Sequence, residues 1–241
     1  MMIKKFSNFD ELNDFAADKF IALANEAVEK RGCFTVALSG GSTPKALYKL
    51  LTNAKFRDRV DWKSVQFFFG DERNVLPDEA ESNFLMANET LFQPLKIAKK
   101  RICRWHTEIE PPENIAAEYA EKLEKFFKGF PVFDLTLLGM GDDGHTASLF
   151  PYTEALRETT KIACANFVEK LNTTRLTLTF PVINNARNAM FLVQGADKSE
   201  VLREVLEGAF QPEKYPSQAV KLTGGELLWL VDDAAAAFLG R

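Results

Sequence analysis

The stretch that decides the fold is residues 133–151, which read FDLTLLGMGDDGHTASLFP. It begins with a largely apolar run, residues 133–138, of the kind that forms a strand buried on both faces of a sheet. The run ends in a loop with three glycines, which let a backbone turn sharply and approach a ligand closely. Two aspartates and His145, one of two histidines in the chain, lie among these glycines. Because histidine titrates near neutral pH and can carry a proton through a reaction, the loop indicates a functional site.

The rest of the chain alternates short apolar runs with helical patterns. Strands are expected at residues 34–38, 65–69, 133–138, 176–180, 189–193 and 227–231. Helices are expected at about residues 10–30, 44–51, 83–91, 113–127 and 198–206. Continuous apolar strands separated by helices favour a mainly parallel sheet with helices on both faces, a Rossmann-like three-layer α/β sandwich.

Size and composition predict one domain over residues 1–241, because no linker, repeat or low-complexity tract divides the chain. The net charge of −4 gives no reason to expect a nucleic-acid or membrane surface. The three cysteines show neither pairing-type spacing nor a CxxC motif, which leaves almost nothing for a structural zinc site. The N-terminus is too charged for a signal peptide, and no apolar run reaches about 18 residues. We therefore expect a cytoplasmic protein.

Three unusual loops follow expected strands, at residues 39–44, 70–77 and 139–151. In mainly parallel sheets, ligands bind outside the carboxyl ends of the strands. The position of all three loops at such ends is the strongest physical argument for an active site at this edge of the sheet.

The first loop carries groups suited to an anion. Ser39, Gly40, Gly41, Ser42 and Thr43 lie between a strand and a helix. Glycines free N–H groups to face an anion near a helix N-terminus, and the hydroxyls add donors. The loop lacks the GxxxxGK[ST] pattern of a Walker motif. A tight strand-to-helix turn with a capping serine is equally compatible, so both interpretations stay open.

The third loop also matches the dinucleotide fingerprint, with Gly139, Gly141 and Gly144 at the required spacing. Asp142 and Asp143 would place negative charge against a pyrophosphate. The acidic residue expected about 20 positions further on is missing as well. Dinucleotide binding is therefore disfavoured.

Charged residues near other strand ends are further candidates. Asp71 and Arg73 directly follow the expected strand 65–69, and Arg175 and Lys198 lie near later strands. Such charges are solvated surface groups by default. Their place at strand ends favours contacts with a substrate and, for Arg175 and Lys198, with a phosphate.

Six stretches in order along nearly the whole chain resemble the 6-phosphogluconolactonase family, within the wider group that includes glucosamine-6-phosphate deaminases. They are residues 37–44, 68–73 with 81–83, 138–151, 175–179, 195–198 and 229–232. The resemblance implies hydrolysis of 6-phosphoglucono-1,5-lactone to 6-phosphogluconate, the second step of the oxidative pentose phosphate pathway. It also implies no organic cofactor, no obligatory metal, and a small sugar-phosphate lactone as the partner.

The resemblance implies roles for individual residues. His145 is the expected catalytic base, Arg73 lies near the substrate, and Arg175 with Lys198 surrounds the phosphate. We infer in addition that Asp143 or Asp142 orients the imidazole, with Asp143 taken as the catalytic partner. Further substrate contacts are expected from the Gly-rich loop at residues 39–43, from Asp71 and from Gly141. Backbone N–H groups of a Gly-rich loop, or Arg73, would stabilise the oxyanion that develops when water attacks the lactone carbonyl.

Two alternatives stay open. The deaminases carry a glutamate in a pattern like GHIAFNEP, where this chain has Phe150, which cannot transfer a proton. They also carry an aromatic residue after Asp-Glu, where this chain has Arg73. A sugar-phosphate-binding sensor would keep the anion-binding residues without needing His145. The sequence leaves the oligomeric state open, with a monomer favoured.

Overall fold

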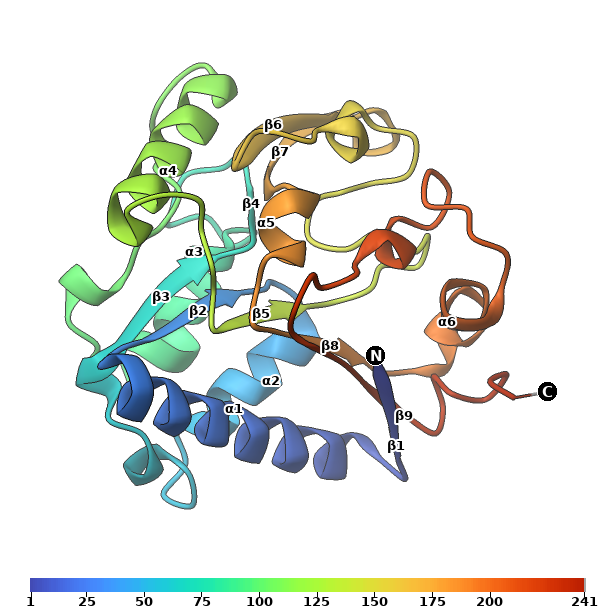
Figure 1. Cartoon of the computed structure of the whole chain (residues 1–241), viewed down its shortest axis with the longest axis horizontal. Helices are drawn as coiled ribbons and strands as arrows, with labels where there is room; N and C mark the ends of the chain where they lie inside the picture. Colours follow the sequence, from blue (N-terminus) through green and yellow to red (C-terminus); the bar gives the residue numbers. More distant parts are fainter. Residues whose placement is uncertain (241) are drawn as a thin grey trace.

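Six short strands form one parallel sheet in the computed structural model, which describes residues 1–240 (Figure 1). Their order across the sheet is β1-β9-β8-β5-β2-β3, and every neighbouring pair is parallel. The strands are β1 (Met2–Phe6), β2 (Phe34–Leu38), β3 (Val65–Phe69), β5 (Leu135–Leu138), β8 (Asn188–Val193) and β9 (Glu226–Asp232). The predicted parallel α/β fold is confirmed.

The helices cover both faces of this sheet. They are α1 (Phe9–Arg31), α2 (Ser42–Leu51), α3 (Asn83–Ala87), α4 (Pro112–Phe127), α5 (Phe180–Asn184) and α6 (Ser199–Glu207). The chain moves from β1 through β2 to β3 in one direction, and from β3 through β5 and β8 to β9 in the other. Right-handed crossovers therefore place the two sets of connections on opposite faces. Figure 1 shows α1 and α2 on one side of the sheet, with α4 and α5 on the other.

Local signals set the ends of the longest helix. The Asn8 side chain accepts a hydrogen bond from the Glu11 N–H at 3.0 Å, which caps the first turn of α1. Gly32, with a φ of 73°, ends the helix and donates to the carbonyl of Val28. Between these ends, α1 buries Leu12 and Phe20 against the sheet.

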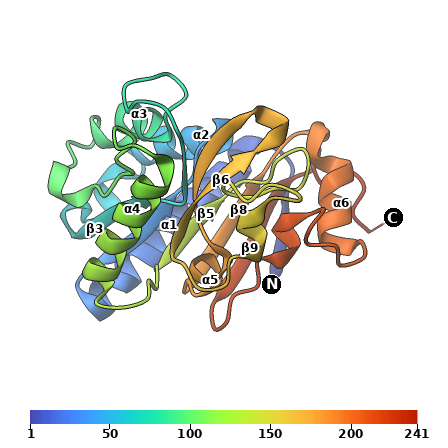
Figure 2. The same ribbon diagram turned by 90° about the horizontal axis from the view of Figure 1, so that it is seen from above.

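A small antiparallel sheet lies over one face of the main sheet, beside α4 (Figure 2). It contains β4 (Asp71–Arg73), β7 (Thr173–Leu178) and β6 (Ala163–Val168). The sequence pattern predicts only a loop at residues 70–77 and predicts no strand at residues 163–168. It predicts a strand at residues 176–180, whereas β7 ends at Leu178 and α5 begins at Phe180. No helix within residues 1–240 is long and apolar enough to cross a bilayer.

The direction of winding reverses between β2 and β5, which lie side by side. The connection after β2 runs toward one edge of the sheet, and the connection after β5 runs toward the other. A crevice therefore opens between the two loops that leave these strands, and ligands of open α/β sheets bind at such a switch point. The first and third predicted loops follow β2 and β5 directly.

Candidate active site

A cavity of about 450 Å³ lies at this switch point. All three predicted loops contribute to its lining, together with β7. The predicted residues that line it are Ser39, Gly40, Gly41, Asp71, Arg73, Gly141, His145 and Arg175. Four predicted residues do not line it, namely Ser42, Thr43, Asp143 and Lys198. The fold thus brings together residues more than 130 positions apart in the sequence.

His145 and Asp143 form the pair with the most evident chemistry. The His145 Nδ1 atom lies 2.6 Å from Asp143 Oδ1, which also accepts from the backbone N–H of His145 at 3.2 Å. An ionised carboxylate only accepts hydrogen bonds, so this contact places the ring proton on Nδ1 and leaves the Nε2 lone pair free. Burial alone would raise the pKa of Asp143, but hydrogen bonds from His145 and Lys170 outweigh it and hold that pKa well below its usual range. Asp143 therefore stays a carboxylate and positions His145 through the Nδ1 atom of the ring.

The imidazole is held between Gly141 and Phe150. A Cβ atom at Gly141 would lie 2.1 Å from His145 Nδ1, so only glycine permits this approach. The Phe150 ring also stacks on the imidazole, with centroids 4.0 Å apart. The backbone closes the loop, because the Gly141 N–H donates to the His145 carbonyl at 2.9 Å. The ring thus has little freedom to rotate away from the cavity.

Replacing Gly141 with alanine should displace the imidazole without removing any catalytic group. A shift of about 1 Å in such a group costs about 10²-fold in turnover, so we expect a loss of that order in Gly141→Ala. Gly139→Ala is the matched control, because a Cβ there meets no atom within 4 Å. Steady-state kinetics of both variants test the expectation. Equal turnover in the two would show that the close approach at Gly141 does not matter.

The loop after β2 is fixed by two contacts. The Tyr48 hydroxyl donates to the Ser39 carbonyl at 2.8 Å and accepts from the Ser39 N–H at 3.0 Å. Gly40 leaves room for Asn83, since a Cβ at Gly40 would lie 1.9 Å from the Asn83 side-chain oxygen. The N–H groups of Gly40 and Gly41 have no hydrogen-bond partner among the described residues. Both residues line the cavity just before α2, so these two donors are available to a bound anion.

Two arginines lie side by side across the antiparallel pair β4–β7, where Arg73 is opposite Arg175. The Arg73 guanidinium donates to the Glu81 carbonyl at 2.7 Å. Within the described part of the chain, no carboxylate lies within 4.0 Å of either guanidinium. Burial, and next the positive charge of Arg73, lower the pKa of Arg175. Two adjacent cations without a carboxylate partner form a site for an anionic group such as a phosphate.

Buried polar side chains tie the three loops together. The Ser148 hydroxyl donates to Asp71 Oδ2 at 2.8 Å, and the Asn83 amide donates to the Asp71 carbonyl at 3.0 Å. Asp71 is 7% exposed and keeps one face on the cavity. Its neighbour Glu72 points the other way and accepts from the N–H groups of Asn83 and Phe84 at 2.7 and 2.9 Å. The carboxyl group of Glu72 thereby holds the N-terminus of α3 against β4.

Glu72 should make stability depend on pH. Burial raises its pKa from 4.5 to about 7, so the unfolded chain releases this proton at a lower pH than the folded chain does. The free energy of unfolding should therefore fall by up to about 3 kcal/mol as the pH rises from about 5 to 8. Urea denaturation across this range tests it, with Glu72→Gln as the comparison. We expect a flatter profile in the variant, and an equally steep one would assign the effect to another group.

Lys170 is a candidate that the sequence analysis missed. It lines the cavity, and its ammonium group lies 3.1 Å from Asp143 Oδ2 and 3.8 Å from Asp142 Oδ1. Asp142, Asp143 and His145 are also the one cluster of potential metal ligands within residues 1–240, with ligand atoms within 4.8 Å of one another. Lys170 already supplies positive charge at both carboxylates.

Three further predicted residues, Ser42, Thr43 and Lys198, do not line the cavity. Ser42 and Thr43 form the first turn of α2. Lys198 lies in the turn after β8, and its ammonium group is 3.5 Å from the carboxylate of Asp197. Its contact with a phosphate stays a prediction that this arrangement does not test.

The fold and the cavity define a doubly wound α/β protein with a histidine–carboxylate pair and an anion site at the switch point. Residues 7–229 match the family described as glucosamine-6-phosphate isomerases/6-phosphogluconolactonase, and the chain belongs to this family. A 6-phosphogluconolactonase of Nostoc sp. is 40% identical over 226 residues, covering 92% of this chain and 91% of the relative. One of Synechocystis sp. is 41% identical over 214 residues, covering 87% and 86%. The solved 6-phosphogluconolactonase of Trypanosoma cruzi superposes with a TM-score of 0.88 at 28% identity, over 99% of this chain and 97% of that one.

Proposed function

We propose that this chain hydrolyses 6-phospho-D-glucono-1,5-lactone to 6-phospho-D-gluconate, the second step of the oxidative pentose phosphate pathway. The observation that carries the proposal is the contact of His145 Nδ1 with Asp143, which leaves the Nε2 lone pair free in a cavity that also holds two arginines. Neither arginine has a carboxylate partner among residues 1–240. The relatives named 6-phosphogluconolactonase support the same activity.

The reaction needs an activated water and a protonated leaving group. The lactone carbonyl is already electrophilic, so the Nε2 atom of His145 takes a proton from water as the water oxygen attacks C1. The tetrahedral intermediate carries a negative oxygen, which the free N–H groups of Gly40 and Gly41 or the guanidinium of Arg73 stabilise. When the bond from C1 to the ring oxygen breaks, the imidazolium returns the proton to that oxygen. General base and acid catalysis of this kind contributes about 10²–10⁴-fold.

The phosphate group of the substrate positions the lactone and takes no part in the bond changes at C1. It carries about two negative charges near neutral pH, and the facing guanidinium groups of Arg73 and Arg175 offer two matching cations. Binding energy from this remote group holds C1 at the catalytic base. Asp71, buried and hydrogen-bonded to Ser148, is left to accept a hydrogen bond from a sugar hydroxyl.

Replacing Arg175 with methionine should weaken substrate binding more than it slows turnover. Charge-assisted hydrogen bonds contribute about 1.5–3 kcal/mol, so KM for the phosphorylated lactone should rise about 10- to 100-fold. Arg57→Met is the control, since Arg57 is exposed and does not line the cavity. Both variants are compared on glucono-1,5-lactone with and without the phosphate. An Arg175→Met enzyme that still prefers the phosphorylated lactone as strongly as wild type would remove Arg175 from the phosphate site.

Product analysis separates the proposal from its alternatives. A deaminase would release ammonia from glucosamine 6-phosphate, and a sensor would bind sugar phosphates without turnover. The structure gives one argument against a deaminase, because Phe150 packs on the imidazole where a proton-transferring glutamate would be needed. We expect acid release from the lactone and no ammonia from glucosamine 6-phosphate. Ammonia release would favour the deaminase, and binding without turnover of either compound would favour the sensor.

We also propose that the chain acts as a single domain and a monomer in the cytoplasm. One connected core of buried side chains extends from α1 to β9, which supports a single domain. The three cysteines are unpaired, which suits a reducing compartment. Size-exclusion chromatography with light scattering tests the monomer.

A further inference from the structure

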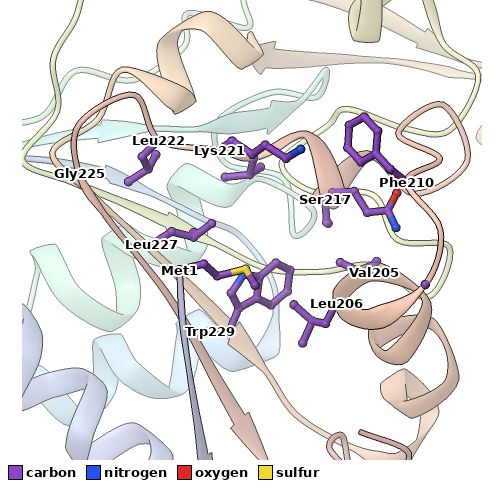
Figure 3. A pocket seen from close by; sticks show the side chains of 13 residues that line it. Met1, Val205, Leu206, Phe210, Ser217, Lys221, Leu222, Gly225, Leu227 and Trp229 are labelled. Atoms are coloured by element: carbon purple, nitrogen blue, oxygen red, sulfur yellow. The ribbon is translucent and has the colours of Figure 1, made fainter. Parts of the chain in front are cut away.

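A second cavity of about 450 Å³ lies between α6, the loop after it and β9, and we call it the α6–β9 cavity (Figure 3). This volume lies within the range of about 300–1,000 Å³ typical of small-molecule sites. Its walls are mainly apolar, with contributions from Val205, Leu206, Val220, Leu222, Leu227 and Trp229. None of these residues belongs to the proposed active site.

Trp229 brings an unsatisfied hydrogen-bond donor to this cavity. The side chain is 1% exposed and stacks on Phe191, with ring centroids 3.7 Å apart and planes 3° from parallel. Its indole Nε1 atom is buried and has no hydrogen-bond partner among the described residues. Indole nitrogen only donates, and native structures rarely leave a buried donor without an acceptor. The site therefore lacks an acceptor beside Trp229.

The charge of the cavity has one sign. Among the described residues of the lining, Lys221 has the only charged side chain, and none is an aspartate or glutamate. Its ammonium group lies 4.0 Å from the centre of the Phe210 ring, and no carboxylate within residues 1–240 approaches it within 4.0 Å. Figure 3 shows this side chain extended along the rim of the cavity.

The other polar groups of the lining are already engaged. The Gln218 side chain accepts from the Gln211 N–H and donates to two backbone carbonyls. The Ser217 hydroxyl donates to the His145 carbonyl at 3.3 Å, and the Ser217 N–H donates to the Gly144 carbonyl at 2.9 Å. Among the side chains of the lining, only the donors of Trp229 and Lys221 remain for a ligand. Ser217 also connects the wall of this cavity to the loop that carries His145.

We propose that the α6–β9 cavity binds a small monocarboxylate with an apolar body, of the class of medium-chain fatty acids. The carboxylate accepts from the Trp229 N–H, and the flexible side chain of Lys221 neutralises its charge. The apolar body packs between α6 and β9. One cation matches one negative charge, and the apolar walls do not suit a sugar phosphate. Met1 lies beside the indole in Figure 3, and its unbranched side chain can move aside.

Titration calorimetry of the full chain with octanoate, in the absence of substrate, tests the proposal independently of the lactonase activity. We expect saturable binding to wild type. Trp229→Phe keeps an aromatic ring on Phe191 but removes the donor, and Lys221→Met keeps an apolar stem but removes the charge. Each should weaken binding about tenfold or more, because each removes a hydrogen bond to a charged group. Lys125→Met, on the exposed side of α4, should bind like wild type.

Two results would overturn the proposal: no saturable binding of octanoate at millimolar concentration, or wild-type affinity in both cavity variants. Octan-1-ol, with the same chain and no charge, should bind more weakly than octanoate, and equal affinity would contradict a carboxylate site. Circular dichroism establishes that the variants are folded. If Trp229→Phe does not fold, Lys221→Met compared with Lys125→Met decides the question.

Discussion

His145→Ala should lower the turnover number about 10²–10⁴-fold while leaving KM and folding nearly unchanged. The imidazole can take a proton from water and return it to the ring oxygen, since its Nδ1 is engaged by Asp143 and a lone pair is left on Nε2. Removing it leaves the loop after β2 and both arginines in place, so the substrate still binds. Steady-state kinetics with the rate of spontaneous hydrolysis subtracted measure both constants.

His106→Ala is the matched control for this experiment. The second histidine of the chain lies outside the cavity, 3.0 Å from Glu118 and in contact with Lys122. We expect its turnover number to remain within about twofold of wild type, because surface substitutions rarely disturb a distant site. A folded His145→Ala enzyme with unchanged turnover would remove His145 as the base. Equal losses in both variants would indicate a general effect of removing histidine.

Asp143→Asn should lower the turnover number by about 10²-fold or more with little change in KM. An asparagine can turn its amide N–H toward Nδ1, which moves the ring proton to Nε2 and removes the lone pair that accepts from water. Asp143 does not line the cavity, so its effect acts through the position and tautomer of His145. A loss confined to kcat distinguishes this role from substrate binding.

Asp142→Asn is the control that decides between the two adjacent aspartates. Asp142 lines the cavity, but its side chain is 70% exposed, and its nearest charged partner is Lys170 at 3.8 Å. We expect turnover close to wild type in this variant. A larger loss in Asp142→Asn than in Asp143→Asn would reverse the assignment of the residue that positions His145.

The central strands were predictable because burial on both faces makes them largely apolar. The predicted ranges 34–38 and 65–69 coincide with β2 and β3, and all ten residues are buried. By contrast, β1 (Met2–Phe6) was not predicted. It is an edge strand with two lysines, partly exposed, and such strands lack the apolar signal. The small sheet was missed because an apolar run does not reveal which strand it pairs with.

The candidate site was predictable where glycines, charges and a histidine follow strand ends. Sequence could not choose between Asp142 and Asp143, since that choice depends on which carboxylate reaches Nδ1 across 2.6 Å. No sequence pattern identifies Lys170 as a site residue, because its position depends on how β6 and β7 fold back over the catalytic loop. Lys198, expected at the phosphate, does not line the cavity.

The most direct test of the account is the rate at which the wild-type protein consumes freshly generated 6-phosphoglucono-1,5-lactone, compared with the same solution without protein. We predict an acceleration proportional to protein concentration that saturates with the phosphorylated lactone. Consumption at the spontaneous rate by folded protein would contradict the lactonase assignment and the role of His145 together.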